Sequence, residues 1–281
     1  MIAFFNGQYT DKQSIGVSPD DRGFLFGEGV YEVIRSYNGF LFAADLHLNR
    51  LRRSADELSI QCPEIADLKT VAVRLIETNN LKDSDATIYI QITRGAAKRS
   101  HTFPSPDTEP TVYISASPFQ TNRQQQEDGI CVTLIPDIRW SRCDIKSVSL
   151  LPNVLGSQSA REYNAAEAVF VRDNTITEGT HTNAFCVSGG TVITYPESNY
   201  ILPGITRKVA IDLCHQLDIP VIQYPVQKEA FLISDEVFLT GTTLEITPVI
   251  QVGHTVIADK KPGPVVRRLQ EAFRNRTTES L

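Results

Sequence analysis

The stretch Arg142-Cys-Asp-Ile-Lys-Ser-Val-Ser-Leu-Leu-Pro-Asn153 places a lysine, Lys146, among apolar residues. It follows Gly129-Ile-Cys-Val-Thr-Leu-Ile-Pro136, whose β-branched residues and alternation predict a strand. A lysine in this setting either extends its ammonium into water from the edge of a core or lies in a dry cavity. An amine nucleophile needs the second setting, and the rest of the chain decides between the two.

The length of the chain, 281 residues, predicts two domains because it exceeds the size of a typical single domain. The polar run at 120–128 predicts the interdomain linker. We therefore expect one domain over 1–119 and a second over 129–281. Each half mixes predicted strands with a few helices, and no nucleotide-binding glycine motif follows a strand. This mixture predicts an α+β or α/β chain of two domains, not a doubly wound fold, and α+β is the fold class that we expect.

Composition excludes several classes of protein. The net charge of −6 is made of interspersed signs without a basic stripe, which argues against a nucleic-acid partner. No apolar run approaches the about 20 residues that span a bilayer, and the N-terminus lacks the features of a signal peptide. The five cysteines are widely spaced without a C-x-x-C pair, which predicts reduced thiols in a cytoplasmic protein and supports neither disulfides nor a metal site.

The first half is rich in predicted hairpins. Asn6-Gly7 and Asn38-Gly39 each separate two short apolar runs and predict tight turns, and the glycine- and aromatic-rich stretch 20–31 predicts a bend. Helices are expected over 44–60 and 66–79, and strands over 87–93 and 111–116. Arg50 borders the apolar stripe of the first helix on a face that it shares with His47 and Ser54. It either reaches a phosphate or covers the edge of the core.

Two glycine-bearing turns in the second half have the chemistry of an anion site. Gly204-Ile-Thr206 opens a predicted helix, whose first N–H groups lack partners within the helix. Gly241-Thr-Thr243 follows an apolar strand and supplies hydroxyls. Glu178 ends another strand, where it either accepts hydrogen bonds from a turn or pairs with a buried cation. Each feature alone is weak, since a glycine before a helix is usually only a cap.

Taken together, a lysine amine, a carboxylate, two anion-type turns and an arginine are the groups that pyridoxal 5'-phosphate uses. Four spaced motifs then resemble the fold type IV pyridoxal phosphate enzymes, and the resemblance runs from Phe5-Asn-Gly7 to the last predicted helix. The motifs are Asp144-Ile-Lys-Ser147 with Leu151-Pro-Asn153, Thr177-Glu-Gly179 with Thr182-Asn-Ala-Phe185, Leu202-Pro-Gly-Ile-Thr-Arg207, and Thr240-Gly-Thr-Thr-Leu-Glu-Ile-Thr-Pro248.

The resemblance implies a small N-terminal α/β domain and a larger C-terminal mixed β domain that enclose the cofactor, in a homodimer. It implies that Lys146 forms the Schiff base and moves a proton, and that Glu178 contacts the pyridine nitrogen. The implied phosphate ligands are Arg50, Ile205, Thr206, Gly241 and Thr242, with Ile205 and Gly241 acting through backbone N–H groups.

Two stretches of the first half resemble the bacillus-type D-amino acid aminotransferases within that family. They are Gly27-Glu-Gly-Val-Tyr31-Glu and the loop Arg94–Pro104, which contains Arg99 and His101. In that subgroup a tyrosine, an arginine and a histidine bind the substrate α-carboxylate, the last two coming from the neighbouring subunit. A guanidinium suits this task because it binds carboxylates through two parallel hydrogen bonds. One departure is Thr180-His-Thr182, where the subgroup often has serines.

The expected reaction is transamination of D-amino acids, for example D-alanine and 2-oxoglutarate giving pyruvate and D-glutamate. Alternatives within the family are a transaminase for branched-chain L-amino acids or (R)-amines, and an aminodeoxychorismate lyase. The complete set of Tyr31, Arg99 and His101 argues against the lyase. A cofactor-carrying binding protein without activity would require Lys146 or Glu178 to be idle.

Overall fold

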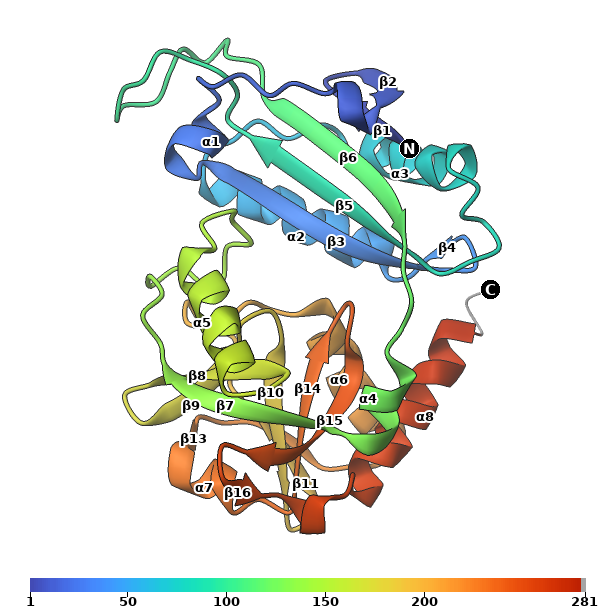
Figure 1. Ribbon diagram of the computed structural model, residues 1–281, viewed down its shortest axis with the longest axis vertical. Coiled ribbons are helices and arrows are strands. Elements are labelled where there is room, and N and C mark those ends of the chain that lie inside the picture. The colour runs from blue at the N-terminus through green and yellow to red at the C-terminus, as the bar shows by residue number, and fades with distance from the viewer. Residues whose placement is uncertain (279–281) are drawn as a thin grey trace. The chain divides into compact units, whose positions relative to one another are not determined.

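A computed structural model describes residues 1–278 of the chain, which form two compact units (Figure 1). Unit 1 contains Met1–Gln120 and Ile145–Ser149, and unit 2 contains residues 121–144 and 150–278. The segment Ile145–Ser149 therefore packs with the first half of the chain, although the sequence placed it in the second. The reason is local: the Tyr31 N–H donates to the Lys146 carbonyl at 3.0 Å, and the Val148 N–H donates to the Gly29 carbonyl at 3.0 Å.

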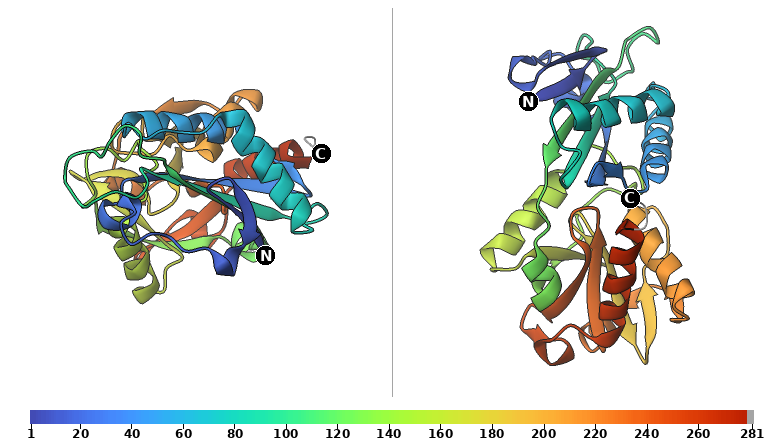
Figure 2. Two further views of the ribbon diagram at one scale, coloured as in Figure 1. Left: turned by 90° about the horizontal axis from the view of Figure 1, so that it is seen from above. Right: turned by 90° about the vertical axis from the view of Figure 1, so that its right-hand side faces the viewer.

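Unit 1 is a six-stranded sheet with helices α2 (Ala44–Glu57) and α3 (Ile65–Thr78) packed on one side of it (Figure 2). The strand order is β2-β1-β6-β5-β3-β4, and all pairs are antiparallel. Asn6, Gly7, Asn38 and Gly39 have positive φ angles, as the two predicted tight turns require. The strands are β1 (Ile2–Phe5), β2 (Gln8–Asp11), β3 (Gly29–Tyr37), β4 (Phe40–Leu41), β5 (Ala86–Thr93) and β6 (Thr111–Pro118).

The stretch 20–31, expected to bend, contains a short helix, α1 (Arg22–Phe26), and the start of β3. The Asp21 carboxylate caps α1 by accepting from the Gly23 N–H, and Gly27 ends it in the left-handed region with φ +70°. A five-residue helix is too short to show the periodicity that predicts longer ones, which is why the sequence did not indicate it.

Unit 2 is built around a ten-stranded mixed sheet in the order β12-β11-β10-β14-β15-β7-β8-β9-β13, with β16 beside β15. Pairing of Glu178 in β9 with Asn183 in β10 closes six of these strands into a ring. The strands are β7 (Ile130–Pro136), β8 (Glu167–Arg172), β9 (Thr175–Gly179), β10 (Asn183–Ser188), β11 (Thr191–Thr194), β12 (Val221–Gln223), β13 (Val226–Gln227), β14 (Glu236–Gly241), β15 (Glu245–Val252) and β16 (Thr255–Val256).

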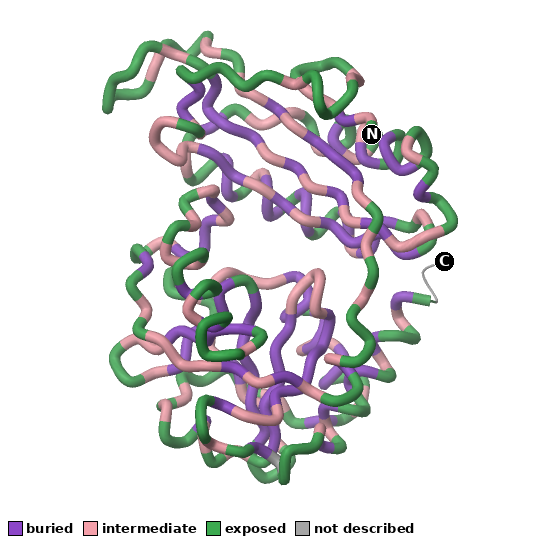
Figure 3. Tube along the Cα trace, in the orientation of Figure 1, coloured by how far each residue is buried: buried purple, intermediate pink, exposed green. Residues whose placement is uncertain are grey.

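Helices surround the sheet of unit 2, and the strands they cover are its most buried part (Figure 3). Parallel pairs such as β7–β8 need a crossover, which α5 supplies. Helices and antiparallel pairs in both units confirm the predicted α+β class. The helices are α4 (Arg123–Asp128), α5 (Leu151–Glu162), α6 (Ile205–Gln216), α7 (Lys228–Leu232) and α8 (Pro264–Thr278), and 3₁₀ turns lie at Lys12–Ser14 and Ala258–Lys260.

The run 120–128, expected as a linker, contains α4, which belongs to unit 2. Asn122 caps this helix by accepting from the Gln125 N–H, and Gln126 is buried, donating to the Glu245 carboxylate at 2.9 Å. The polar composition of the run 120–128 therefore reflects a capped helix with a buried hydrogen bond. Throughout residues 1–278, no helix combines the length and the apolar character that crossing a bilayer demands.

Candidate active site

Lys146 lies beside Tyr31 in unit 1. Its Nζ is 4.3 Å from the centroid of the Tyr31 ring, a distance at which an ammonium is attracted to an aromatic face. Its backbone is fixed on both sides, because the Lys146 N–H donates to Ser54 Oγ at 3.2 Å and its carbonyl accepts from the Tyr31 N–H. Two residues predicted from separate motifs thus lie side by side.

Arg50 is buried in α2 and binds Glu32, a fully buried residue of β3 that no motif predicted. Its Nε and Nη2 donate to the two Glu32 oxygens at 2.6 and 3.0 Å. His47 Nδ1 lies 2.8 Å from Glu32 Oε2. Burial alone would raise the pKa of Glu32, but the charge of Arg50 and the hydrogen bonds of its two partners outweigh burial and lower it. Arg50 is therefore held in one orientation by a permanent anion.

Arg99 and His101 lie on the exposed loop between β5 and β6, which extends past the end of the sheet (Figure 1). Both side chains contact the ring of Phe26 in α1: the Arg99 guanidinium carbon is 5.2 Å from its centroid and the His101 ring centroid 5.7 Å. Tyr31 stacks on Tyr89 instead, at 5.8 Å. Within one chain the structure thus brings Arg99 together with His101 at Phe26, and Tyr31 together with Lys146.

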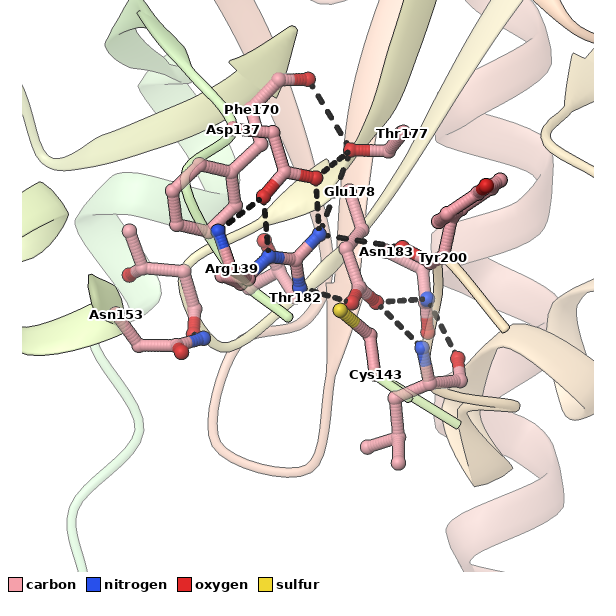
Figure 4. Close-up of polar contacts among 12 residues, drawn as sticks. Asp137, Arg139, Cys143, Asn153, Phe170, Thr177, Glu178, Thr182, Asn183 and Tyr200 are labelled. Carbon is pink, nitrogen blue, oxygen red and sulfur yellow. Dashed lines mark hydrogen bonds and ion pairs between the residues drawn. The ribbon is translucent and has the colours of Figure 1, made fainter. Parts of the chain in front are cut away.

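Glu178 lies at the centre of a polar cluster in unit 2 (Figure 4). Its Oε1 accepts from Arg139 Nη1 at 2.5 Å, and its Oε2 accepts from Asn183 Nδ2 and the Leu202 N–H, both at 3.0 Å. Arg139 is shared, because its Nε and Nη2 donate to the two oxygens of Asp137, each at 2.9 Å. One guanidinium therefore serves two carboxylates.

This sharing leaves the charge of Glu178 under-compensated. Burial raises the pKa of Glu178 to about 7, against the opposing influence of Arg139 and the Leu202 amide, and the nearby Asp137 charge adds to the increase. A carboxyl of this kind is stabilised as an anion by any further cation that comes to lie beside it. That property suits a partner such as a protonated pyridine nitrogen.

The turn before α6 provides amide groups close to Glu178 in the same unit. The Leu202 N–H donates to Glu178. Two residues later Gly204 is the N-cap of α6 and provides no side-chain cap, so the N–H groups of the first helical turn are available. A Cβ at Gly204 would overlap the side-chain oxygen of Asn183. Glycine is thus required there for a close approach. Ile205 and Thr206 are both buried in this first turn.

The second predicted turn begins at Gly241, the last residue of β14, and continues through Thr242; both residues are half-buried. Beside it, the buried Thr240 Oγ1 has no hydrogen-bond partner among residues 1–278. Such an unpaired buried hydroxyl is uncommon in native structures and calls for a bound group or water.

The turn Thr180-His-Thr182, where the sequence differs from the resembled subgroup, is held by Glu167. No motif in the sequence pointed to Glu167. The Thr180 hydroxyl donates to Glu167 Oε1 at 2.5 Å, and the Thr182 hydroxyl donates to Oε2 at 3.3 Å. The two threonine hydroxyls can therefore do here what serine hydroxyls would do.

Sequence reasoning missed Glu32, Arg139 and Asn183. One signal for Glu32 was available, because it lies between Val30 and Ile34 on the alternating buried face of a strand, where a charge needs a partner. Arg139 carried no comparable signal, since its contacts with Glu178 and Tyr200 span 39 and 61 residues of the chain.

The chain matches the family model of class IV amino-transferases over residues 29–252. It is 41% identical over 278 residues to a D-alanine aminotransferase of Staphylococcus haemolyticus, covering 99% of this chain and 98% of the relative. A D-alanine aminotransferase of Bacillus licheniformis is 39% identical over 276 residues, covering 98% and 96%.

Among solved structures, the branched-chain amino acid aminotransferase of Escherichia coli superposes with a TM-score of 0.92 and 28% identity, covering 99% of this chain and 95% of that chain. The sequence alone predicted this family from the motifs around Lys146, Glu178, Gly204 and Gly241. The chain belongs to the class IV aminotransferases, as those motifs predicted.

Proposed function

We propose that this aminotransferase exchanges the amino group of D-amino acids with 2-oxo acids, such as D-alanine and 2-oxoglutarate giving pyruvate and D-glutamate, and that it uses pyridoxal 5'-phosphate. Relatives named D-alanine aminotransferases, 37–41% identical over nearly the whole chain, support the substrate class. The branched-chain alternative has less support, because the solved branched-chain enzyme is 28% identical. No feature of the described residues favours an (R)-amine transaminase or the lyase.

The observation that carries the cofactor proposal is the setting of Glu178. Its buried carboxyl is under-compensated by a shared arginine, and a helix that begins three residues after Leu202 offers uncapped amides. This arrangement fits a group with a pyridine nitrogen at one end and a phosphate at the other. The proposed phosphate ligands are Arg50, Ile205, Thr206, Gly241 and Thr242, with Glu178 at the pyridine nitrogen.

When bound, the cofactor supplies a carbonyl for the substrate amine and a ring that accepts electrons from the α-carbon. The amine of Lys146 would hold the cofactor, and the same residue would move the proton at the substrate α-carbon. Tyr31 orients that lysine through the contact at 4.3 Å, and Arg50 binds the phosphate in the orientation that Glu32 imposes. Arg99 and His101, with Tyr31, bind the α-carboxylate of the substrate.

We propose further that the enzyme is a homodimer in which Arg99 and His101 serve the neighbouring subunit. The apolar side chains Leu151, Val154 and Leu155 lie on one face of α5 and are 53–69% exposed, and such a patch is typical of an interaction surface. Leu155→Glu is expected to shift the sedimentation coefficient to that of a monomer and to remove activity with D-alanine. The cytoplasmic location expected from the sequence stays a prediction.

The proposed function is tested with a panel of amino donors in both enantiomers. Single-turnover reactions are monitored through the absorbance of the bound cofactor. D-alanine should react and L-alanine should not; reaction with L-amino acids or simple amines alone would refute the substrate class. Borohydride reduction followed by mass spectrometry should find a pyridoxyl adduct on the Lys146 peptide. Arg99→Ala should raise KM for D-alanine by about 10-fold or more, since it removes a charge-assisted contact.

A further inference from the structure

We propose that Glu28 is a positioning residue that fixes Arg99 and His101 for binding of the substrate carboxylate. The inference rests on the proposed function, which assigns that role to the two residues. It concerns a group of charged side chains in unit 1 that the proposed chemistry does not use: Arg22, Glu28 and Arg94.

Glu28 joins two arginines that come from different parts of unit 1. Arg22 Nε and Nη2 donate to its two oxygens at 2.8 and 2.6 Å, and Arg94 Nε donates to Oε2 at 2.6 Å. Arg22 is wholly buried and Arg94 is 8% exposed. Both guanidinium groups converge on the same carboxylate oxygen, so a single negative charge holds two buried positive charges together.

Each arginine also holds the loop that carries Arg99 and His101. Arg22 Nη1 donates at 2.8 Å to the carbonyl of Ser100, the residue between Arg99 and His101. Arg94 begins the loop, and its guanidinium lies 3.7 Å from the centroid of the Phe103 ring, two residues after His101. The loop is thus bound at its start and on both sides of His101 by groups that Glu28 keeps in place.

The other two nitrogens of Arg94 anchor the cluster to the rest of the unit. Nη1 donates to the Ser59 carbonyl at 2.7 Å and Nη2 to the Leu58 carbonyl at 2.6 Å, both just after α2. Backbone bonds add to this anchoring, because the Arg22 N–H donates to the Gly95 carbonyl at 2.9 Å and the Arg94 N–H to the Glu28 carbonyl at 3.1 Å. The base of the loop therefore cannot move independently of Glu28.

Phe26 transmits this placement to the two carboxylate-binding side chains. The guanidinium of Arg22 lies 4.6 Å from the Phe26 ring centroid, and Arg99 and His101 contact the same ring. Loss of the Glu28 charge would leave Arg94 to repel Arg22, the arginine that contacts this ring. An arginine fork must meet a carboxylate with the correct geometry, and a misplacement of about 1 Å can cost about 10²-fold in rate.

The experiment compares Glu28→Gln with the wild-type holoenzyme on D-alanine and on D-alaninamide, which lacks the carboxylate. KM for D-alanine and for 2-oxoglutarate should rise about 10-fold or more, kcat should change about threefold or less, and kcat/KM for the amide should stay near that of wild type. In an Arg99→Ala background, Glu28→Gln should add little further, because both changes remove one function. Glu77→Gln, which removes the exposed pair with Lys82, is the matched control.

Equal losses on D-alanine and its amide, or an unchanged KM for D-alanine, would overturn the inference. Should Glu28→Gln not fold, Phe26→Leu decides, because it removes the ring and retains the ion cluster; the same selective rise in KM is expected, and Phe26→Tyr should restore the wild-type value. If the wild-type enzyme accepts L-alanine instead of D-alanine, the proposed function fails. The comparison of that donor with its own amide then still tests Glu28.

Discussion

Glu32 in unit 1 and Glu178 in unit 2 are both buried carboxylates paired with an arginine, yet their pKa values move in opposite directions. Glu32 receives two hydrogen bonds from Arg50 and lies beside His47, and its pKa is lowered. Glu178 receives one bond from Arg139, and its pKa is raised to about 7. Burial acts in the same direction on both, so the difference comes from how much positive charge each one has.

The difference indicates two kinds of site. The charge of Glu32 is balanced within the protein, so that this residue fixes Arg50 whether or not a ligand is present. The charge of Glu178 is not balanced, because Asp137 takes two nitrogens of the shared Arg139. The ionised form of Glu178 is stabilised further when a cationic group binds beside it. A buried pair with full compensation is thus structural, and one with partial compensation is suited to a ligand.

The largest effect is expected from Glu32→Gln, which removes the anion and leaves Arg50 buried without it. Breaking a buried ion pair in this way typically lowers the free energy of unfolding by about 3–5 kcal/mol. Urea denaturation of the cofactor-free protein at pH 7 measures it. The exposed-pair variant Glu77→Gln should lose about 1 kcal/mol or less. A similar small loss in Glu32→Gln would contradict the structural role.

Glu178→Gln should lower activity strongly and change the stability of the fold little, in contrast to Glu32→Gln. Turnover of D-alanine should fall roughly 10²–10³-fold, the size of effect seen when one electrostatic group of an active site is removed. The free energy of unfolding without cofactor should change by about 1 kcal/mol or less, because the burial cost of the carboxylate disappears together with its hydrogen bonds. A loss of stability as large as that of Glu32→Gln would abolish the distinction between the two sites.

The two carboxylates should also give stability curves of opposite slope with pH. Glu178 has a folded pKa above its unfolded value, so the folded state binds more protons. The contribution of Glu178 to the free energy of unfolding therefore falls by about 1–3 kcal/mol as the pH rises from about 4.5 to 7. Glu32 has a lowered folded pKa, so its contribution is present above about pH 4.5 and is lost below it. Subtracting the curve of each Gln variant from that of wild type isolates each slope; slopes of equal sign would be inconsistent with the structure.

The smallest effect concerns cofactor loading. A pyridine nitrogen bound to Glu178 would supply the missing positive charge. Loading with pyridoxal 5'-phosphate should therefore reduce the pH-dependent change in unfolding free energy that Glu178 causes to about 1 kcal/mol or less. Removal of the cofactor should restore the slope. Thermal melts of both forms between pH 5 and 7 measure this, with Glu178→Gln as the form that lacks the Glu178 contribution. Identical slopes with and without cofactor would remove Glu178 from the pyridine nitrogen.

Most of the regular elements could be predicted from local sequence. The Asn-Gly turns, the apolar stripe of α2 and the alternation of β5 each follow from side chains a few residues apart. Short elements could not: α1 and α4 are five and six residues long. The packing of Ile145–Ser149 with unit 1 depends on its backbone bonds to β3, more than a hundred residues earlier, and no local pattern records such a pairing.

The sequence by itself determined the family and the proposed site residues, because the motifs around Lys146, Glu178, Gly204 and Gly241 are short and contiguous. Only the tertiary structure decided which arginine each carboxylate meets and how completely its charge is balanced. Glu32 and Arg50 are 18 residues apart, Glu178 and Arg139 are 39 apart, and Arg22 lies 78 residues from Ser100. Burial and electrostatic compensation depend on such distant neighbours, so two glutamates that look alike in the sequence acquire opposite properties in the fold.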